Sequence, residues 1–463
     1  MVQPVYLFNT ANRKVELFEP INAGEVRMYS CGPTVYNFVH VGNLRAFVFA
    51  DIYRRTLELA GYSVKHVMNI TDVGHLTDDA DSGEDKMLLA MRREGKTAHE
   101  IAQFYTDHFL QDAQDLNLLE PLARPKATEC IAEQIDLVQK LEENGFTYTT
   151  SGGVYFDTAK YERYGAMAKL DIEGLRGGER VDLGEKRNKT DFALWKFSPK
   201  GEKRDMEWES PWGIGFPGWH IECSAMSKKY LGAHFDIHTG GIDHIPVHHT
   251  NELAQSECAN GEKYANYWLH NEFLVLDKDT KISKSSGNFI TLASVKERGL
   301  NPLALRYFFL QAHYRQQQQF TWEALDAAAA GLKKLQRKVA ELEGALQEAV
   351  HPQTQERFMK ALFNDFNTPQ ALAVVWEELA SDHSNGQKLA LARMAEAALG
   401  LELVDVAVDE NVELPADILE LINQRDAARS AKDWEKSDHL RDALQSAGYT
   451  VQDTAAGTKV SKS

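Results

Sequence analysis

The first 70 residues follow a strand–helix–strand pattern of hydrophobic and polar positions. Residues 26–32 and 63–71 are short, strand-like runs, and a turn-rich segment follows the first of them. Apolar residues then recur at helical spacing from Leu44 onwards, which predicts an amphipathic helix that ends at Gly61. Because two strands joined by such a helix are typical of a parallel sheet, the expected fold class is α/β.

The pattern changes several times further along the chain. Residues 85–147 are predicted to be helical, whereas 148–208 consist of short aromatic segments separated by glycine, which predicts a β-like insertion. Residues 212–290 are expected to return to strands and turns. After residue 293 the pattern is helical, and the acidic stretch 404–415 is predicted to link the helices to a small terminal module.

Composition limits the classes of protein that remain. A chain of 463 residues with 43% hydrophobic and 26% charged residues is typical of a folded protein with several domains. No apolar run approaches the ~18 residues that a membrane span needs, and the N-terminus lacks an export pattern. Four scattered cysteines favour a reducing compartment, so cytoplasmic localisation is expected. The net charge of −17 argues mildly against a nucleic-acid partner.

Two short segments carry residues suited to phosphate chemistry. His40, Gly42 and Asn43 lie at a predicted strand-to-helix junction, where free backbone N–H groups favour an anion. Lys281 and Lys284 lie three residues apart in a loop rich in Ser and Gly, which suits closure over a polyphosphate. Either segment alone is also compatible with an ordinary helix cap or a solvated basic turn.

Four further residues have the chemistry of a zinc site. Cys31 precedes the first of these segments, Cys223 lies far from it, and His248 and Glu252 are spaced i and i+4, so they share one helix face. Two thiolates, an imidazole and a carboxylate are suitable zinc ligands. Spacing alone leaves open that the cysteines are merely buried small side chains.

The amino-acid sequences of these segments resemble the motifs of a known family. HVGN followed by KISKS resembles the paired HIGH and KMSKS signatures of class I aminoacyl-tRNA synthetases, with Asn43 and Ile282 as the departures. SCGPTVYN, PGWHIECSAM and FDIHTGGIDHIPVHHTNELAQS resemble the cysteinyl-tRNA synthetases within that class. The resemblance implies a Rossmann-like parallel-sheet catalytic domain split by an insertion, then an all-α helical bundle and a small anticodon-binding module.

The resemblance also divides the chain into domains. The expected parts are the first half of the catalytic domain, the insertion, the second half with the KISKS loop, a stem-contact helical segment, the helical bundle and the anticodon-binding module, at residues 1–125, 126–211, 212–292, 293–325, 326–410 and 411–463. The insertion is too short for a large editing module. The acidic stretch 77–85 departs from the family pattern and is expected to be a solvated loop.

The matching positions carry the family's roles. The expected metal ligands, for one Zn²⁺ per chain, are Cys31, Cys223, His248 and Glu252. The expected catalytic residues are His40, Lys281 and Lys284, and the residues expected to bind ATP are His40, Gly42, Asn43 and Lys284. The expected contacts to the amino acid are Thr71, Trp219 and Asp243. His238 and His244 are expected to be polar pocket residues rather than ligands. His249 is expected to lie on a different helix face from His248 and not to be the ligand, and Cys130 and Cys258 are expected to be structural.

A pocket zinc has a physical purpose in such an enzyme. Cysteine and serine differ by one atom, and shape alone separates near-isosteres by no more than about 10²-fold. A thiolate binds zinc strongly, whereas a serine hydroxyl is a weak ligand. The metal would therefore select cysteine without an editing domain.

The resemblance implies tRNA(Cys), ATP with Mg²⁺ and L-cysteine as partners, no membrane, and a monomer. Local basic residues of the terminal module, Arg425, Arg429, Lys432, Lys436 and Arg441, are expected to meet the tRNA despite the overall acidity. Trp434 has two interpretations, a stacking platform for an unpaired base or a core residue of the module.

Two other functions remain open from the sequence. A ligase that activates cysteine in the same way and passes it to an amino sugar shares the catalytic half but lacks a comparable anticodon module. A non-catalytic regulator that binds zinc and nucleotide is the second alternative.

Overall fold

A computed structural model of the chain describes residues 2–74, 86–170, 185–199, 204–276, 289–342, 345–404, 416–431, 433–447, 449–454 and 457–462. They form two compact units, Met1–Leu403 and Val404–Ser463. The predicted lysines Lys281 and Lys284, together with the stretch 77–85, lie outside the described residues.

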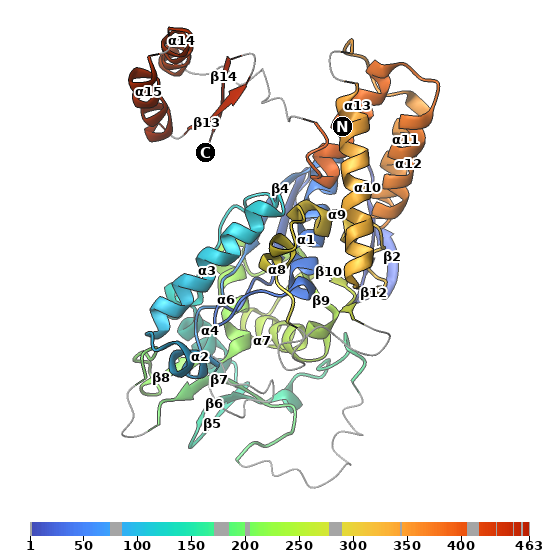
Figure 1. The fold of residues 1–463 in the computed structure, drawn as a ribbon. Coiled ribbons are helices and arrows are strands. Elements are labelled where there is room, and N and C mark those ends of the chain that lie inside the picture. The colour runs from blue at the N-terminus through green and yellow to red at the C-terminus, as the bar shows by residue number, and fades with distance from the viewer. Residues whose placement is uncertain are drawn as a thin grey trace. The chain divides into compact units, whose positions relative to one another are not determined.

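A four-stranded parallel sheet with the order β10-β9-β3-β4 organises the first unit (Figure 1). Its strands are β3 (Glu25–Ser30), β4 (Ser63–Met68), β9 (Phe235–Gly241) and β10 (Ala265–Asn271). Strands β3 and β9 are distant in sequence but adjacent in the sheet, so the strand order reverses between them. In parallel sheets the carboxyl edge at such a reversal is the usual place for a ligand.

Side chains point to alternate faces along the strands of this sheet, and a different helix covers each face. Met28 of β3 belongs to the same hydrophobic core as α1 (Val41–Leu59), whereas the next residue, Tyr29, belongs to the core of α6 (Trp219–Leu231). Successive side chains of a strand point to opposite faces, so burial on both faces requires a covering helix on each. The predicted strand–helix–strand unit at the N-terminus is therefore confirmed.

The insertion is a separate antiparallel sheet with the order β5-β6-β7-β8. Its strands are β5 (Thr147–Thr150), β6 (Gly153–Phe156), β7 (Phe192–Phe197) and β8 (Gly215–Pro217). Phe156 and Trp195 are buried against α4 (Ile131–Glu143) and neighbouring helices. The β structure predicted for 148–208 is confirmed by β5, β6 and β7 in the described part of this range.

The prediction of strands and turns throughout 212–290 is wrong for two stretches. Helix α6 and helix α7 (Thr250–Asn260) both lie in this segment. These helices do not show a single buried stripe: in α6, His220–Ser227 is buried without interruption. A helix that is buried all round lacks the periodicity by which amphipathic helices are found.

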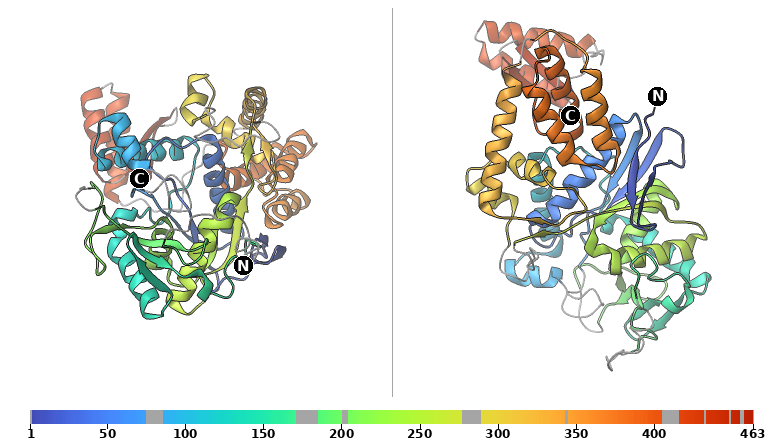
Figure 2. Two further views of the ribbon diagram at one scale, coloured as in Figure 1. Left: turned by 90° about the horizontal axis from the view of Figure 1, so that it is seen from below. Right: turned by 90° about the vertical axis from the view of Figure 1, so that its right-hand side faces the viewer.

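Helices dominate the remaining part of the first unit (Figure 2). They are α2 (Lys86–Glu94), α3 (Ala98–Asp115), α8 (Leu292–Glu297), α9 (Pro302–Leu310), α10 (Trp322–Ala340), α11 (Pro352–Phe363), α12 (Thr368–Ala380) and α13 (Asn385–Leu399). Short strand pairs complete the unit: β1 (Tyr6–Asn9) with β2 (Lys14–Leu17), and β11 (Leu274–Val275) with β12 (Gln318–Gln319). The helical character predicted after residue 293 is confirmed.

The second unit contains α14 (Ala416–Ser430), α15 (Trp434–Ser446), β13 (Tyr449–Thr454) and β14 (Gly457–Lys462). Its small core includes Ile418 and Leu444. Trp434 is 60% exposed, which excludes the core interpretation of this tryptophan. Arg425 is only 1% exposed, so the prediction that it presents surface charge is wrong: it faces the interior of the helix pair.

Among the residues described here, no helix is long and apolar enough to cross a membrane.

Candidate metal centre and active-site pocket

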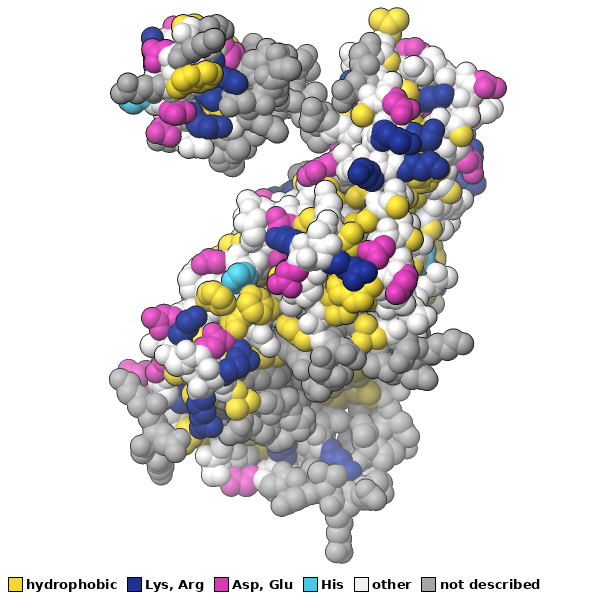
Figure 3. All heavy atoms as spheres, in the orientation of Figure 1, with side chains coloured by type: hydrophobic (Ala, Val, Ile, Leu, Met, Phe, Trp, Pro, Cys, Tyr) yellow, Lys and Arg dark blue, Asp and Glu magenta, His cyan; other side chains and the backbone are white. Residues whose placement is uncertain are grey.

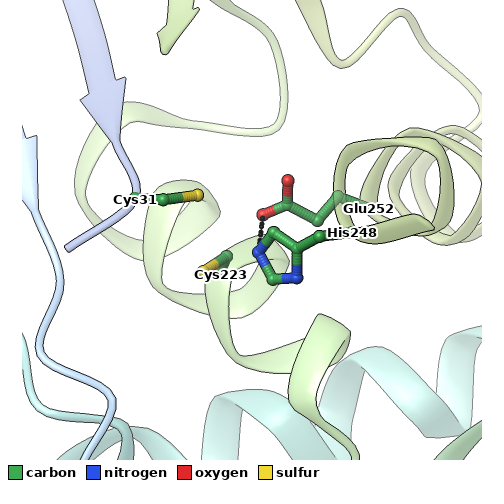
Figure 4. Close-up of side chains that lie close together, drawn as sticks. All are labelled: Cys31, Cys223, His248 and Glu252. Carbon is green, nitrogen blue, oxygen red and sulfur yellow. Dashed lines mark ion pairs between the residues drawn. The ribbon is translucent and has the colours of Figure 1, made fainter. Parts of the chain in front are cut away.

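Four side chains from four different elements meet at the carboxyl edge of the parallel sheet (Figure 4). Cys31 directly follows β3, Cys223 lies in α6, His248 lies in the π-helical turn Ile245–His249, and Glu252 lies in the first turn of α7. One donor atom from each lies within 4.8 Å of the others, and all four residues are buried. These are the four residues that the sequence predicts as zinc ligands.

The donor set is incomplete without a cation. Glu252 Oε1 lies 3.6 Å from His248 Nε2, and its Oε2 lies 3.0 Å from His238 Nε2, so the buried carboxylate faces imidazoles from both donor sets. Burial raises the pKa of the Cys31 thiol well above its ordinary value, and the adjacent Cys223 raises it further. A buried carboxylate beside two thiols is costly unless a cation compensates it, so the residues present fit a zinc ion.

His248 is held in place by its neighbours in α6. Its Nδ1 lies 3.0 Å from Nδ1 of His220, and its ring packs on Trp219 with centroids 4.4 Å apart. Contact through Nδ1 directs the Nε2 side of the ring towards Glu252, which is the usual arrangement of a metal-binding histidine with an outer partner. The sequence analysis missed His220. Its position three residues before Cys223, on the same helix, could have identified His220 as a residue of the site.

A second four-donor set overlaps the first. It consists of Cys31, His238, His249 and Glu252, all buried and equally close together. His249 Nε2 lies 3.4 Å from Cys31 Sγ, although helical spacing places His249 on another face than His248. The π-helical turn explains this proximity, because it widens the backbone before α7 and brings both histidines to the cluster.

A cavity of about 280 Å³ opens beside the cluster. Three members of the first set, Cys31, Cys223 and His248, line it, whereas His238 and His249 do not. The cavity also brings together the residues predicted to bind ATP and the amino acid; these are His40, Gly42, Asn43, Thr71, Trp219 and Asp243. Lys281 and Lys284 of the KISKS segment lie outside the described residues, so their place relative to the cavity stays a prediction.

The N-terminus of α1 forms one wall of the cavity. His40 is the N-cap residue, and its Nδ1 accepts a hydrogen bond from the backbone N–H of Asn43 at 3.2 Å. A neutral imidazole that accepts at Nδ1 carries its proton on Nε2, so Nε2 of His40 is a hydrogen-bond donor. The partial positive charge at the N-terminus of α1 faces the same wall, where Gly42, without a side chain, allows close approach to the backbone.

Close backbone approach explains two glycines around the cavity. A Cβ at Gly32 would lie 1.7 Å from the carbonyl oxygen of Asn69, and one at Gly240 would lie 2.7 Å from the His249 ring. Asn69 in turn accepts from the Gly32 backbone N–H and donates to Thr71 Oγ1 at 3.0 Å. The sequence analysis missed Asn69, which positions Thr71. Its place just after β4, two residues before the predicted Thr71, could have identified Asn69 as a residue of the site.

Comparisons with known proteins agree with this geometry. Residues 17–330 match the family model described as tRNA synthetases class I (C) catalytic domain, residues 357–398 match the DALR domain, and residues 411–460 match the cysteinyl-tRNA ligase anticodon binding domain. The methionyl-tRNA synthetase of Mycobacterium tuberculosis, solved with methionyl-adenylate, is 14% identical with a TM-score of 0.56, covering 81% of this chain and 92% of that one. The Agrobacterium radiobacter LeuRS, solved with tRNA and LeuAMS, is 12% identical with a TM-score of 0.59, covering 83% and 85%.

A parallel-sheet catalytic domain of this kind, with an insertion and a helical bundle, is that of a class I aminoacyl-tRNA synthetase. A curated "Cysteine--tRNA ligase 1" of Burkholderia lata is 50% identical over 99% of this chain and 97% of its own length. The "Cysteine--tRNA ligase" of Treponema denticola is 44% identical over 98% of both chains. The chain therefore belongs to the cysteine–tRNA ligase family, and it is an enzyme.

Proposed function

We propose that this chain ligates L-cysteine to tRNA(Cys) in two steps within the cytoplasm. The cysteine carboxylate first attacks the α-phosphate of ATP in line, giving cysteinyl-adenylate and pyrophosphate. The terminal ribose of the tRNA then takes the cysteinyl group and releases AMP. The observation that carries the proposal is the buried Cys31–Cys223–His248–Glu252 set at one end of a cavity whose other wall is the N-terminus of α1.

The nucleotide would lie against α1. His40 Nε2–H and the partial positive charge of the helix N-terminus at Gly42 suit phosphate oxygens that gain charge in the transition state, and Asn43 lines the same wall. Lys281 and Lys284 are proposed to close over the polyphosphate, together with the Mg²⁺ that accompanies ATP as a substrate. No covalent enzyme nucleophile is needed, because orientation and charge stabilisation carry such a reaction.

The amino acid would lie between α1 and α6. Asp243 and Thr71 line the cavity and supply polar groups for the ammonium and carboxylate, while Trp219 supplies an apolar wall. Cys31, Cys223, His248 and Glu252 would hold the zinc, which when bound supplies a soft Lewis acid that prefers a thiolate to a hydroxyl. This set is favoured over the one with His238 and His249, because it has two thiolates and borders the cavity.

One experiment tests the function. Cysteine-dependent exchange of pyrophosphate into ATP is expected, followed by cysteine-dependent charging of tRNA(Cys). Serine in place of cysteine is expected to support neither reaction at a comparable rate. Exchange without charging would indicate transfer to a small acceptor such as an amino sugar, and absence of exchange would exclude both ligases.

A basic surface in the helical bundle suits the tRNA backbone. Helix α10 presents Lys333, Lys334 and Arg337 to solvent, with Lys338 half-buried beside them (Figure 3). These residues share one broad face of the helix, in a chain whose net charge is −17. Association with RNA depends on local phosphate contacts. A helix face on which basic residues are concentrated therefore suits tRNA even though the chain as a whole is acidic.

In the second unit, the exposed Trp434 is proposed to stack on an anticodon base.

Reversing one charge on α10 is expected to weaken tRNA binding. Lys333→Glu is expected to raise KM for tRNA roughly tenfold and to reduce the dependence of binding on salt, because a phosphate contact is lost. Pyrophosphate exchange, which needs no tRNA, is expected to remain at the wild-type rate. Lys14→Glu, at an exposed lysine of β2, is the matched control. Equal effects of the two substitutions on KM would contradict a tRNA contact at α10.

A further inference from the structure

An exposed aromatic surface lies beside the cavity and has no role in the steps described above. It is made of Phe38, Phe104 and His108 and is called the aromatic rim here. Phe104 and His108 are one helical turn apart on α3, and their ring centroids lie 4.5 Å apart. Phe38 contacts both, at 6.1 Å from Phe104 and 5.0 Å from His108. Three mutually contacting rings therefore form one continuous surface.

The rim is more exposed than a core cluster. Phe104 is 37% exposed and His108 is exposed, whereas Ile101, Tyr105 and Phe109 of the same helix are buried and already supply the inward face of α3. Figure 3 shows hydrophobic and histidine side chains gathered over α3 on this face. Exposed aromatic rings next to a substrate cavity are typical of a binding surface.

Two cations flank the rings. Lys96 Nζ lies 4.4 Å from the centroid of Phe104, and Arg93 donates a hydrogen bond to the hydroxyl of Tyr105 at 3.1 Å. Both cations approach the single carboxylate of Glu94, and their side chains remain 42% and 51% exposed. Aromatic faces beside partly exposed cations are the combination that binds single-stranded nucleic acid, through base stacking and phosphate contacts.

The position of the aromatic rim next to the cavity indicates which molecule would bind to it. Phe38 lines the cavity and also contacts Phe104 and His108, so the rim begins where the cavity ends. The proposed acceptor of cysteine is the 3′-terminal ribose of a tRNA, which has to reach this cavity. A single strand that ends in the cavity would then pass next to these rings.

We propose that the aromatic rim binds the single-stranded 3′ end of the tRNA, with a base stacked on Phe104 and a phosphate beside Lys96. This inference rests on the proposed function, because it assigns a contact to the tRNA of that reaction. The proposed contact does not involve ATP or cysteine. Its loss is therefore expected to affect the second step of the reaction, the charging of tRNA, and not the first.

Truncating Phe104 tests the proposal. Phe104→Ala is expected to raise KM for tRNA in the charging reaction roughly 5- to 150-fold, the range that follows from stacking energies of about 1–3 kcal/mol per base. Phe104→Trp is expected to retain charging, because an indole also stacks. Cysteine-dependent pyrophosphate exchange is expected to be unchanged in both variants. Leu122→Ala, at a residue 62% exposed, is the control for loss of an exposed apolar side chain.

A shortened tRNA locates the contact. With tRNA from which the single-stranded 3′ nucleotides have been removed, wild type and Phe104→Ala are expected to bind equally, whereas intact tRNA binds the wild type more tightly. Lys96→Ala is expected to lower the slope of log K against log salt by about 0.7, as for one single-strand phosphate. A wild-type KM in Phe104→Ala, or an affinity difference that persists with shortened tRNA, would overturn the proposal. Failure of the wild type to catalyse exchange would instead overturn the proposed function.

Discussion

Replacing Cys223 with serine is expected to remove most of the bound zinc and to weaken cysteine binding by about 100-fold or more. Loss of an outer-shell partner already lowers metal affinity 10- to 100-fold, and Cys223 is a direct donor in the four-residue set. A serine hydroxyl keeps the size of the side chain but remains protonated and binds zinc poorly. ATP binding is expected to be nearly unchanged, because the nucleotide is proposed to lie against α1.

The measurements are zinc content by elemental analysis and the separate affinities for cysteine and ATP. Cys258→Ala is the matched control, since Cys258 is also buried but lies outside the donor set, in the core formed with α4 and the insertion. This control is expected to retain its zinc and its cysteine affinity. Full zinc occupancy of Cys223→Ser with wild-type cysteine affinity would refute the assignment of Cys223 as a ligand.

Replacing Asp51 with alanine is expected to destabilise the first unit by about 3–5 kcal/mol. Asp51 Oδ2 accepts from Arg55 Nε at 2.7 Å and from Arg306 Nη2 at 2.5 Å, and all three side chains are buried. Arg306 also donates to the carbonyl oxygen of Leu399, at the end of α13. The cluster joins α1, which carries His40, to α9 and to the helical bundle, so its loss leaves two buried guanidinium groups without their carboxylate.

Urea unfolding of the first unit measures this change in the free energy of unfolding. Asp326→Ala is the control, because it breaks the Arg298–Asp326 ion pair, whose side chains are 46% and 44% exposed. Such an exposed pair contributes only about 0–1 kcal/mol. Equal losses of stability in the two variants would contradict the importance assigned to the buried cluster.

The same cluster predicts a dependence of stability on pH. Burial by itself raises the pKa of Asp51, but the charges of Arg306 and Arg55 outweigh it, and the pKa lies below the ordinary value of 3.8. A carboxyl group with a lowered pKa in the folded state stabilises that state above its unfolded pKa. This contribution is therefore lost as the pH falls below about 4 through the folded pKa. In Asp51→Asn this part of the acid dependence is expected to disappear.

Several features of the fold could be predicted from local patterns. The strand–helix–strand unit around α1 was visible because its strands are short and bounded by turns and its helix is long, at 19 residues, although most of those residues are buried. The spacing of His248 and Glu252 placed two donors together. Helices α6 and α7 escaped prediction because they are buried on nearly all sides, which removes the contrast that periodicity requires.

The interior of the site was less predictable. His220 and Asn69 act through His248 and Thr71, and such outer contacts depend on side chains from separate elements rather than on spacing. The proximity of His249 to Cys31 results from a π-helical turn, which sequence spacing does not reveal. Arg425 shows the converse, because a residue counted as surface charge is buried once its helix packs.

The sequence by itself determined the family and the α/β class and singled out four candidate donors, because motifs and periodicity are local properties of the chain. Only the tertiary structure decided that Cys31 and Cys223, distant in sequence, reach the same cavity, since α6, which carries Cys223, packs in one core with Tyr29 of β3 and Cys31. It also decided where charge and aromatic surface are exposed. A net charge of −17 is a sum over residues, whereas binding depends on which face of α10 or α3 meets the solvent.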